Sequence, residues 1–81
     1  MSGIARYDER NNKLIVIRKG ENIERLIPCT NFNPKGGDKY FGVEINGDEI
    51  YLLVGPKNNP RPNKKFIYKF SSLTGGGSKT I

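Results

Sequence analysis

The segment FGVEINGDEIYLLV, residues 41–54, decides the fold of this chain of 81 residues. Apolar and polar residues alternate on both sides of Asn46-Gly47-Asp48, and a period of two is typical of half-buried β-strands. Asn-Gly and Gly-Asp are both hairpin turn pairs, so the turn register stays open, but either one places the same side chains on one face. We expect this face to be core, with the members Phe41, Val43, Ile45, Ile50, Leu52 and Val54.

Further strands are predicted on both sides of this hairpin. Residues 13–18 are mostly β-branched and apolar and lie between turn residues, and residues 23–27 form a return strand that Pro28 ends. Residues 64–70 alternate in polarity and form the last strand. Residues 4–7 form a first strand.

Proline, glycine and asparagine interrupt the pattern at residues 28–38 and 55–63, which are therefore predicted to be loops. No window has a helical period. Five or six short antiparallel strands predict an all-β fold, a small barrel or rolled sheet of SH3-like or OB-like size. We expect residues 1–71 to form this single domain. Residues 72–81 are rich in Gly and Ser and have almost nothing to bury, which predicts a flexible tail.

The composition excludes several classes of enzyme. The chain has no histidine and one cysteine, so it lacks the imidazole of Ser-His-Asp triads and of most catalytic zinc sites. Cys29 has no second cysteine for a disulfide or a structural zinc site. No spacing of the other reactive side chains singles out a catalytic set. We therefore predict a non-enzymatic protein with no catalytic residues, no metal and no cofactor.

The same features bear on the cellular compartment. A lone thiol favours a reducing compartment, and the first residues carry no apolar run of the kind found in signal peptides. No stretch approaches the ~18 apolar residues of a membrane span. We expect a cytoplasmic protein with no membrane partner.

Positive charge is concentrated at the C-terminal end of the chain. The net charge is +6, and residues 55–81 contain no Asp or Glu. They carry the cations Lys57, Arg61, Lys64, Lys65, Lys69 and Lys79. Such a field attracts polyanions, of which nucleic acid is the commonest, and neutralising phosphates releases counterions without sequence preference.

On the predicted last strand, aromatic residues alternate with cations. Exposed rings there would stack on single-stranded bases while the lysines follow the phosphate backbone. The predicted nucleic-acid-binding residues are Lys57, Arg61, Lys64, Lys65, Tyr68 and Lys69. Two structural alternatives stay open: Phe66, Tyr68 and Phe70 as a core stripe, and the lysines as a solubilising face or the guard of an edge strand.

Two functions are compatible with these features. The first is the binding of nucleic acid or another polyanion, single-stranded or without sequence specificity. The alternative is a small protein-binding adaptor or inhibitor, for example a virus- or phage-encoded regulator of a host protein, because the chain is short and its two long loops suit protein recognition. The oligomeric state stays open.

Overall fold

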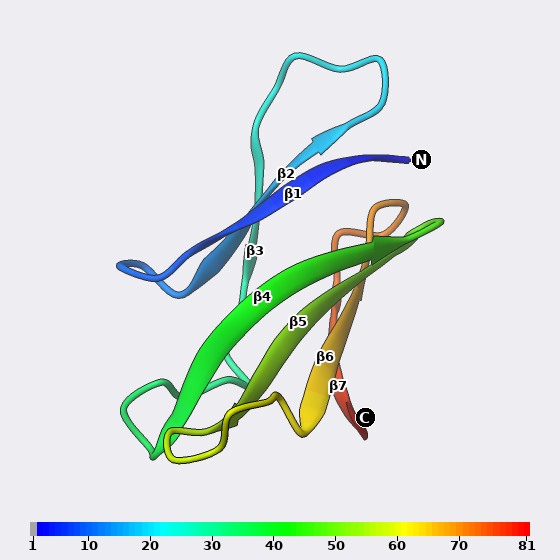
Figure 1. Cartoon of the computed structure of the whole chain (residues 1–81). Helices are drawn as coiled ribbons and strands as arrows, with labels where there is room; N and C mark the ends of the chain where they lie inside the picture. Colours follow the sequence, from blue (N-terminus) through cyan, green and yellow to red (C-terminus); the bar gives the residue numbers. More distant parts are fainter. Residues whose placement is uncertain (1) are drawn as a thin grey trace.

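The computed structural model describes residues 2–81, which contain seven β-strands and no helix, so none that is long and apolar enough to cross a membrane. The strands are β1 (Gly3–Asp8), β2 (Lys13–Arg18), β3 (Arg25–Pro28), β4 (Asp38–Asn46), β5 (Glu49–Pro56), β6 (Lys64–Lys69) and β7 (Gly75–Thr80). The first sheet has the strand order β1-β2-β3, and the second sheet has the order β4-β5-β6-β7 (Figure 1). All pairings are antiparallel.

The prediction of an all-β antiparallel fold is confirmed, whereas the predicted barrel or rolled sheet of five or six strands is confirmed only in part, because the sheets do not close into a barrel. Residues 2–81 form two open sheets with seven strands, rather than five or six strands in one barrel. The segment between β3 and β4 carries Pro34 and two glycines, which stop the ladder, so β3 and β4 lie in different sheets. The sheets pack face to face instead, and β1 contacts β4.

The hairpin of β4 and β5 forms as predicted, with the Gly47-Asp48 turn. Asn46 pairs with Glu49, so Gly47 and Asp48 are the two turn residues. Gly47 has a φ of 60°, and a type II′ turn takes glycine at this first central position.

A β-bulge in β4 changes which aromatic side chain enters the core. The register shifts between Tyr40 and Gly42, so Tyr40 faces the first sheet, where its ring centroid lies 4.7 Å from that of Tyr7. Phe41, which the alternation predicts as a core residue, is half-buried and outside the core cluster. The extra residue of a bulge reverses the alternation of side chains at that point of a strand.

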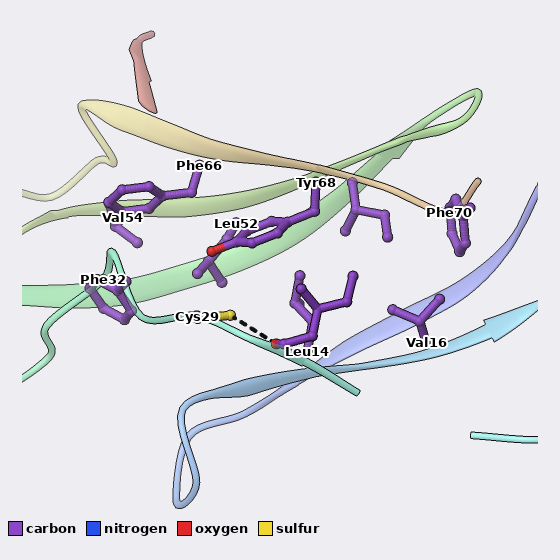
Figure 2. Close-up of a cluster of buried hydrophobic side chains, with 11 residues drawn as sticks. Leu14, Val16, Cys29, Phe32, Leu52, Val54, Phe66, Tyr68 and Phe70 are labelled. Atoms are coloured by element: carbon purple, nitrogen blue, oxygen red, sulfur yellow. Dashed lines mark hydrogen bonds between the residues drawn. The ribbon is translucent and has the colours of Figure 1, made fainter. Parts of the chain in front are cut away.

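The core lies between the two sheets, and Figure 2 shows side chains from both meeting there. Phe66, Tyr68 and Phe70 are 5%, 1% and 1% exposed. The core-stripe alternative for these three residues is therefore right. The prediction that Tyr68 stacks on bases is wrong, because a buried ring has no access to a ligand. The complete cluster is Leu14, Val16, Ile27, Cys29, Phe32, Ile50, Leu52, Val54, Phe66, Tyr68 and Phe70.

The glycine-rich segment expected to be a flexible tail forms β7 in the structure and pairs with β6. Asn31 donates from Nδ2 to the carbonyl oxygen of Gly76 at 2.8 Å. The amide of Ile81 donates to the carbonyl oxygen of Asn63 at 3.1 Å. Backbone hydrogen bonds rather than buried side chains hold this strand, so a hydrophobic pattern cannot predict it.

Removing the Tyr68 hydroxyl is expected to stabilise the protein. This hydroxyl is buried, and within residues 2–81 no group meets it with hydrogen-bond geometry. Burial raises the pKa of the phenol, and so does its contact with the Cys29 thiol, which is only a weak hydrogen-bond partner and does not replace the lost water. A buried hydroxyl left unsatisfied costs about 1–3 kcal/mol. We expect Tyr68→Phe to raise the free energy of unfolding by about 1 kcal/mol, measured by urea denaturation.

Tyr7→Phe is the matched control for this substitution. The Tyr7 hydroxyl donates to Asn12 Oδ1 at 2.6 Å, so its removal should lower the free energy of unfolding by about 1 kcal/mol. A loss of stability in both variants would show that the Tyr68 hydroxyl is satisfied in solution, and would contradict the expectation.

Candidate nucleic-acid interface

β6 directs its side chains to two different faces of the second sheet. Phe66 and Tyr68 point into the core. Because successive side chains of a strand alternate, Lys65, Ile67 and Lys69 point to the opposite side, away from the first sheet. This side is the outer face of the second sheet.

Neighbouring strands contribute further side chains to the outer face. In the sheet register, Lys65 lies opposite Leu53 of β5 and Lys79 of β7, and Ile67 lies opposite Tyr51. The bulged strand β4 adds Lys39 and Phe41 beside them. The outer face is therefore defined by Lys39, Phe41, Glu44, Glu49, Tyr51, Leu53, Lys65, Ile67, Lys69 and Lys79.

Tyr51 occupies the centre of the outer face. Its hydroxyl donates to Glu49 Oε1 at 2.7 Å and accepts from Asn46 Nδ2 at 3.4 Å. The hydrogen bond to Glu49 is the first cause of the raised pKa of Tyr51. Lys65 Nζ lies 4.1 Å from the ring centroid, which is a cation–π distance. Since Tyr51 is only 9% exposed, an approaching ligand meets the Lys65 ammonium before it meets the ring.

Lys39 and Phe41 form a second pair of cation and ring, with Nζ 4.8 Å from the ring centroid. Sequence reasoning missed both residues, as well as Tyr51 and Lys79, as members of a site. The hairpin register was an available signal for Tyr51, because it places that residue opposite the core face. Lys39 and Phe41 belong to the outer face because of the bulge in β4, and Lys79 belongs to it because β7 pairs with β6. Neither feature is visible in the local sequence pattern.

Lys64 does not add a free charge to the outer face. Its Nζ lies 3.1 Å from Asp38 Oδ2 and 5.6 Å from the ring centroid of Phe66. Both partners of this ion pair are about one-third exposed, at 38% and 31%. The carboxylate already neutralises Lys64, and Tyr68 is buried. Of the six residues predicted from the sequence, these two are therefore not part of the candidate site.

Lys57 and Arg61 lie in the exposed loop between β5 and β6. Backbone atoms of residues 61–63 come within 3.1–3.3 Å of the point where a Gly55 side chain would begin. Gly55 follows core-facing Val54, so the loop packs over the outer side of β5 and needs glycine there for its close approach. The loop therefore extends the outer face at one end of the sheet.

The two sheets differ in how their charges are paired. In the first sheet and its turns, three of the six cations, Arg6, Arg18 and Arg25, form an ion pair with Glu21 or Glu24 at 3.0–3.9 Å, whereas only Lys64 is paired among the seven cations of the second sheet and its loop. The outer face of the second sheet holds two acidic residues, Glu44 and Glu49, and Glu49 already accepts from Tyr51. Six cations of the second sheet and its loop form no ion pair in the part of the chain described by the structure: Lys39, Lys57, Arg61, Lys65, Lys69 and Lys79.

Other kinds of site have less support. Between Ser2 and Ile81 no three or more potential metal-ligating side chains come together. Cys29 is fully buried, and burial raises the pKa of its thiol. A protonated and inaccessible thiol is a poor nucleophile.

Comparison of the chain with protein-family models, with curated proteins and with solved structures finds no match. The function of the outer face is therefore inferred from its own residues and their contacts.

Proposed function

We propose that this protein is a non-enzymatic module that binds nucleic acid or another polyanion, single-stranded or without sequence specificity, on the outer face of the second sheet. The observation that carries the proposal is the unequal pairing of charge between the two sheets. The phosphate-binding set consists of Lys57, Arg61, Lys65 and Lys69, joined by Lys39 and Lys79 from the neighbouring strands.

Unpaired lysines on a rigid sheet suit this role for two physical reasons. Each ammonium that neutralises a phosphate releases a condensed counterion, which supplies affinity without reading the sequence of bases. Cations with no acidic partner need not break an ion pair before they bind. Half-buried Leu53, Ile67 and Phe41 lie among them, and such apolar and aromatic side chains contact the faces of unpaired bases.

Fluorescence anisotropy with an oligothymidine of about 20 nucleotides tests the proposal. We expect binding at low ionic strength that weakens as salt is added. In the triple variant Lys65→Gln, Lys69→Gln and Lys79→Gln, the affinity should fall about tenfold or more. The slope of log affinity against log salt should become shallower by about 2, because three phosphate contacts are lost at ~0.7 each.

A second triple variant controls for net charge alone. Lys13→Gln, Lys19→Gln and Lys35→Gln also removes three positive charges, but from residues outside the outer face. We expect it to lose much less affinity than the first. Equal losses in the two variants, or an absence of salt-sensitive binding, would reject the proposal in favour of the protein-binding alternative.

A further inference from the structure

The outer face of the first sheet is aliphatic and uncovered. Ile4 and Leu26 are 61% and 54% exposed, and Ile15 and Ile17 are half-buried between them. Large apolar groups that gather on one face of a soluble protein mark an interaction surface, whereas single exposed ones need no explanation. These four residues define the aliphatic face.

The strand register makes the aliphatic face continuous. Ile4 of β1 lies opposite Ile17 of β2, and Ile15 of β2 lies opposite Leu26 of β3. Two adjoining hollows follow β1 and β2, with cavity volumes of about 470 and 90 Å³, and both are lined by Ile4 and Ile17. The aliphatic face therefore has projecting apolar side chains and adjoining hollows, into which the side chains of a second apolar surface can pack.

One ion pair crosses the aliphatic face. Arg6 of β1 contacts Glu24, which directly precedes β3, at 3.0 Å, and their side chains are 66% and 54% exposed. The face thus carries one positive group near one edge and one negative group near the other. On a chain of net charge +6, two copies repel each other least where local charges cancel.

We propose that two copies of this chain associate through their aliphatic faces, around a twofold axis parallel to β2. A rotation about that axis lays β1 of each copy over β3 of the other. Because Arg6 and Leu26 are both level with Ile15 of β2, Arg6 then lies over Leu26 of the second copy and reaches diagonally to its Glu24, two residues away along the strand. The two ion pairs within the chains, one in each copy, are exchanged for two equivalent ion pairs between the copies. These lie at the rim of the contact, where desolvation costs least. Such an interface is isologous and closed, so it stops at the dimer.

The size of the face sets the strength of the dimer. Three strands ~4.8 Å apart and about six residues long form a face of roughly 14 by 20 Å. Stable interfaces bury about 800 Å² per partner, so this dimer is weak and depends on concentration. Added salt screens the repulsion between the two cationic chains and favours the dimer, whereas it weakens the proposed binding of nucleic acid. The dimer does not rest on the proposed function.

Sedimentation equilibrium of the full chain tests this inference. We expect the average mass to rise from one chain toward two as the concentration increases to the order of 1 mM, and to rise earlier at higher salt. Leu26→Lys should keep the chain monomeric over this range. Ile81→Lys is the matched control, because Ile81 is 61% exposed but lies outside the aliphatic face, and it should dimerise like the unchanged protein.

A mixing experiment tests the exchanged ion pairs. Arg6→Glu and Glu24→Arg should each weaken self-association, because each places like charges opposite one another between two identical copies. An equimolar mixture of the two variants restores both ion pairs between chains, although neither chain has the pair within itself. We expect more dimer in the mixture than in either variant alone. A monomer at all concentrations, or a mixture no better than its components, would overturn the inference.

Discussion

Replacing Gly75 by alanine is expected to detach β7 from β6 and to lower the free energy of unfolding by about 3 kcal/mol. A Cβ atom at this position would lie 2.3 Å from the carbonyl oxygen of Ile67 and 2.7 Å from Cα of Tyr68. Both are backbone atoms of the partner strand and cannot move aside. Gly75 also has a φ of 142°, which side chains rarely permit. Alanine therefore separates the strands or strains both of them.

Gly77→Ala is the matched control, in the same strand and from the same residue type. No atom lies within 4 Å of its virtual Cβ, and its φ is not positive. We expect a change below about 0.5 kcal/mol in urea denaturation. Hydrogen exchange at the amides of β6 and β7 should become faster in Gly75→Ala alone. Equal stabilities of the two variants would mean that β7 does not pair with β6 in solution, and that the sequence-based prediction of a flexible tail was right.

Elements that form through interactions between residues close in the sequence were predicted correctly, whereas features that depend on distant residues were not. The turn at Gly47-Asp48 and the alternation around it are local, so residues 41–54 were sufficient to predict the hairpin of β4 and β5. The bulge beside Gly42 is not local, because it accompanies the contact of Tyr40 with Tyr7 in the other sheet. For this reason the alternation alone placed Phe41 wrongly in the core.

The sequence predicted which segment supplies the cations of the candidate site, but not which of them form ion pairs or which face they lie on. The absence of acidic residues after residue 54 located the cations correctly in the chain. The sequence did not show that Asp38, far from Lys64 along the chain, pairs with it at 3.1 Å. The hairpin register placed Tyr51 opposite the core face, but the sequence left Tyr68 open between a core position and an exposed one, and it is core. Their roles depend on which face the first sheet covers, which is a tertiary property.

Asn12→Ala is expected to lower the free energy of unfolding by about 3 kcal/mol. Asn12 donates from Nδ2 to the carbonyl oxygens of Cys29 and Phe32, at 3.0 and 2.9 Å, and its Oδ1 accepts from the Tyr7 hydroxyl at 2.6 Å. One side chain therefore ties the β1–β2 turn to the segment that crosses from the first sheet to the second. It also fixes the backbone beside Phe32, whose ring is 2% exposed and lies 6.1 Å from that of Phe66.

Alanine at position 12 leaves the Tyr7 hydroxyl and the carbonyl of Phe32 without this partner, while the carbonyl of Cys29 keeps the amide of Phe32 at 3.1 Å. It also adds a backbone penalty. Asn12 has a φ of 52°, a conformation that asparagine tolerates better than alanine does. Asn11→Ala is the control, because Asn11 is exposed and its Nδ2 contacts only the Asp8 carboxylate in the same turn, so a change below about 0.5 kcal/mol is expected. Near-UV circular dichroism during urea denaturation follows the packing of Tyr7 and Phe32. If Asn12→Ala unfolded at the same urea concentration as Asn11→Ala, the crossing segment would be held by the burial of Phe32 alone, and the hydrogen bonds of Asn12 would contribute no net stability.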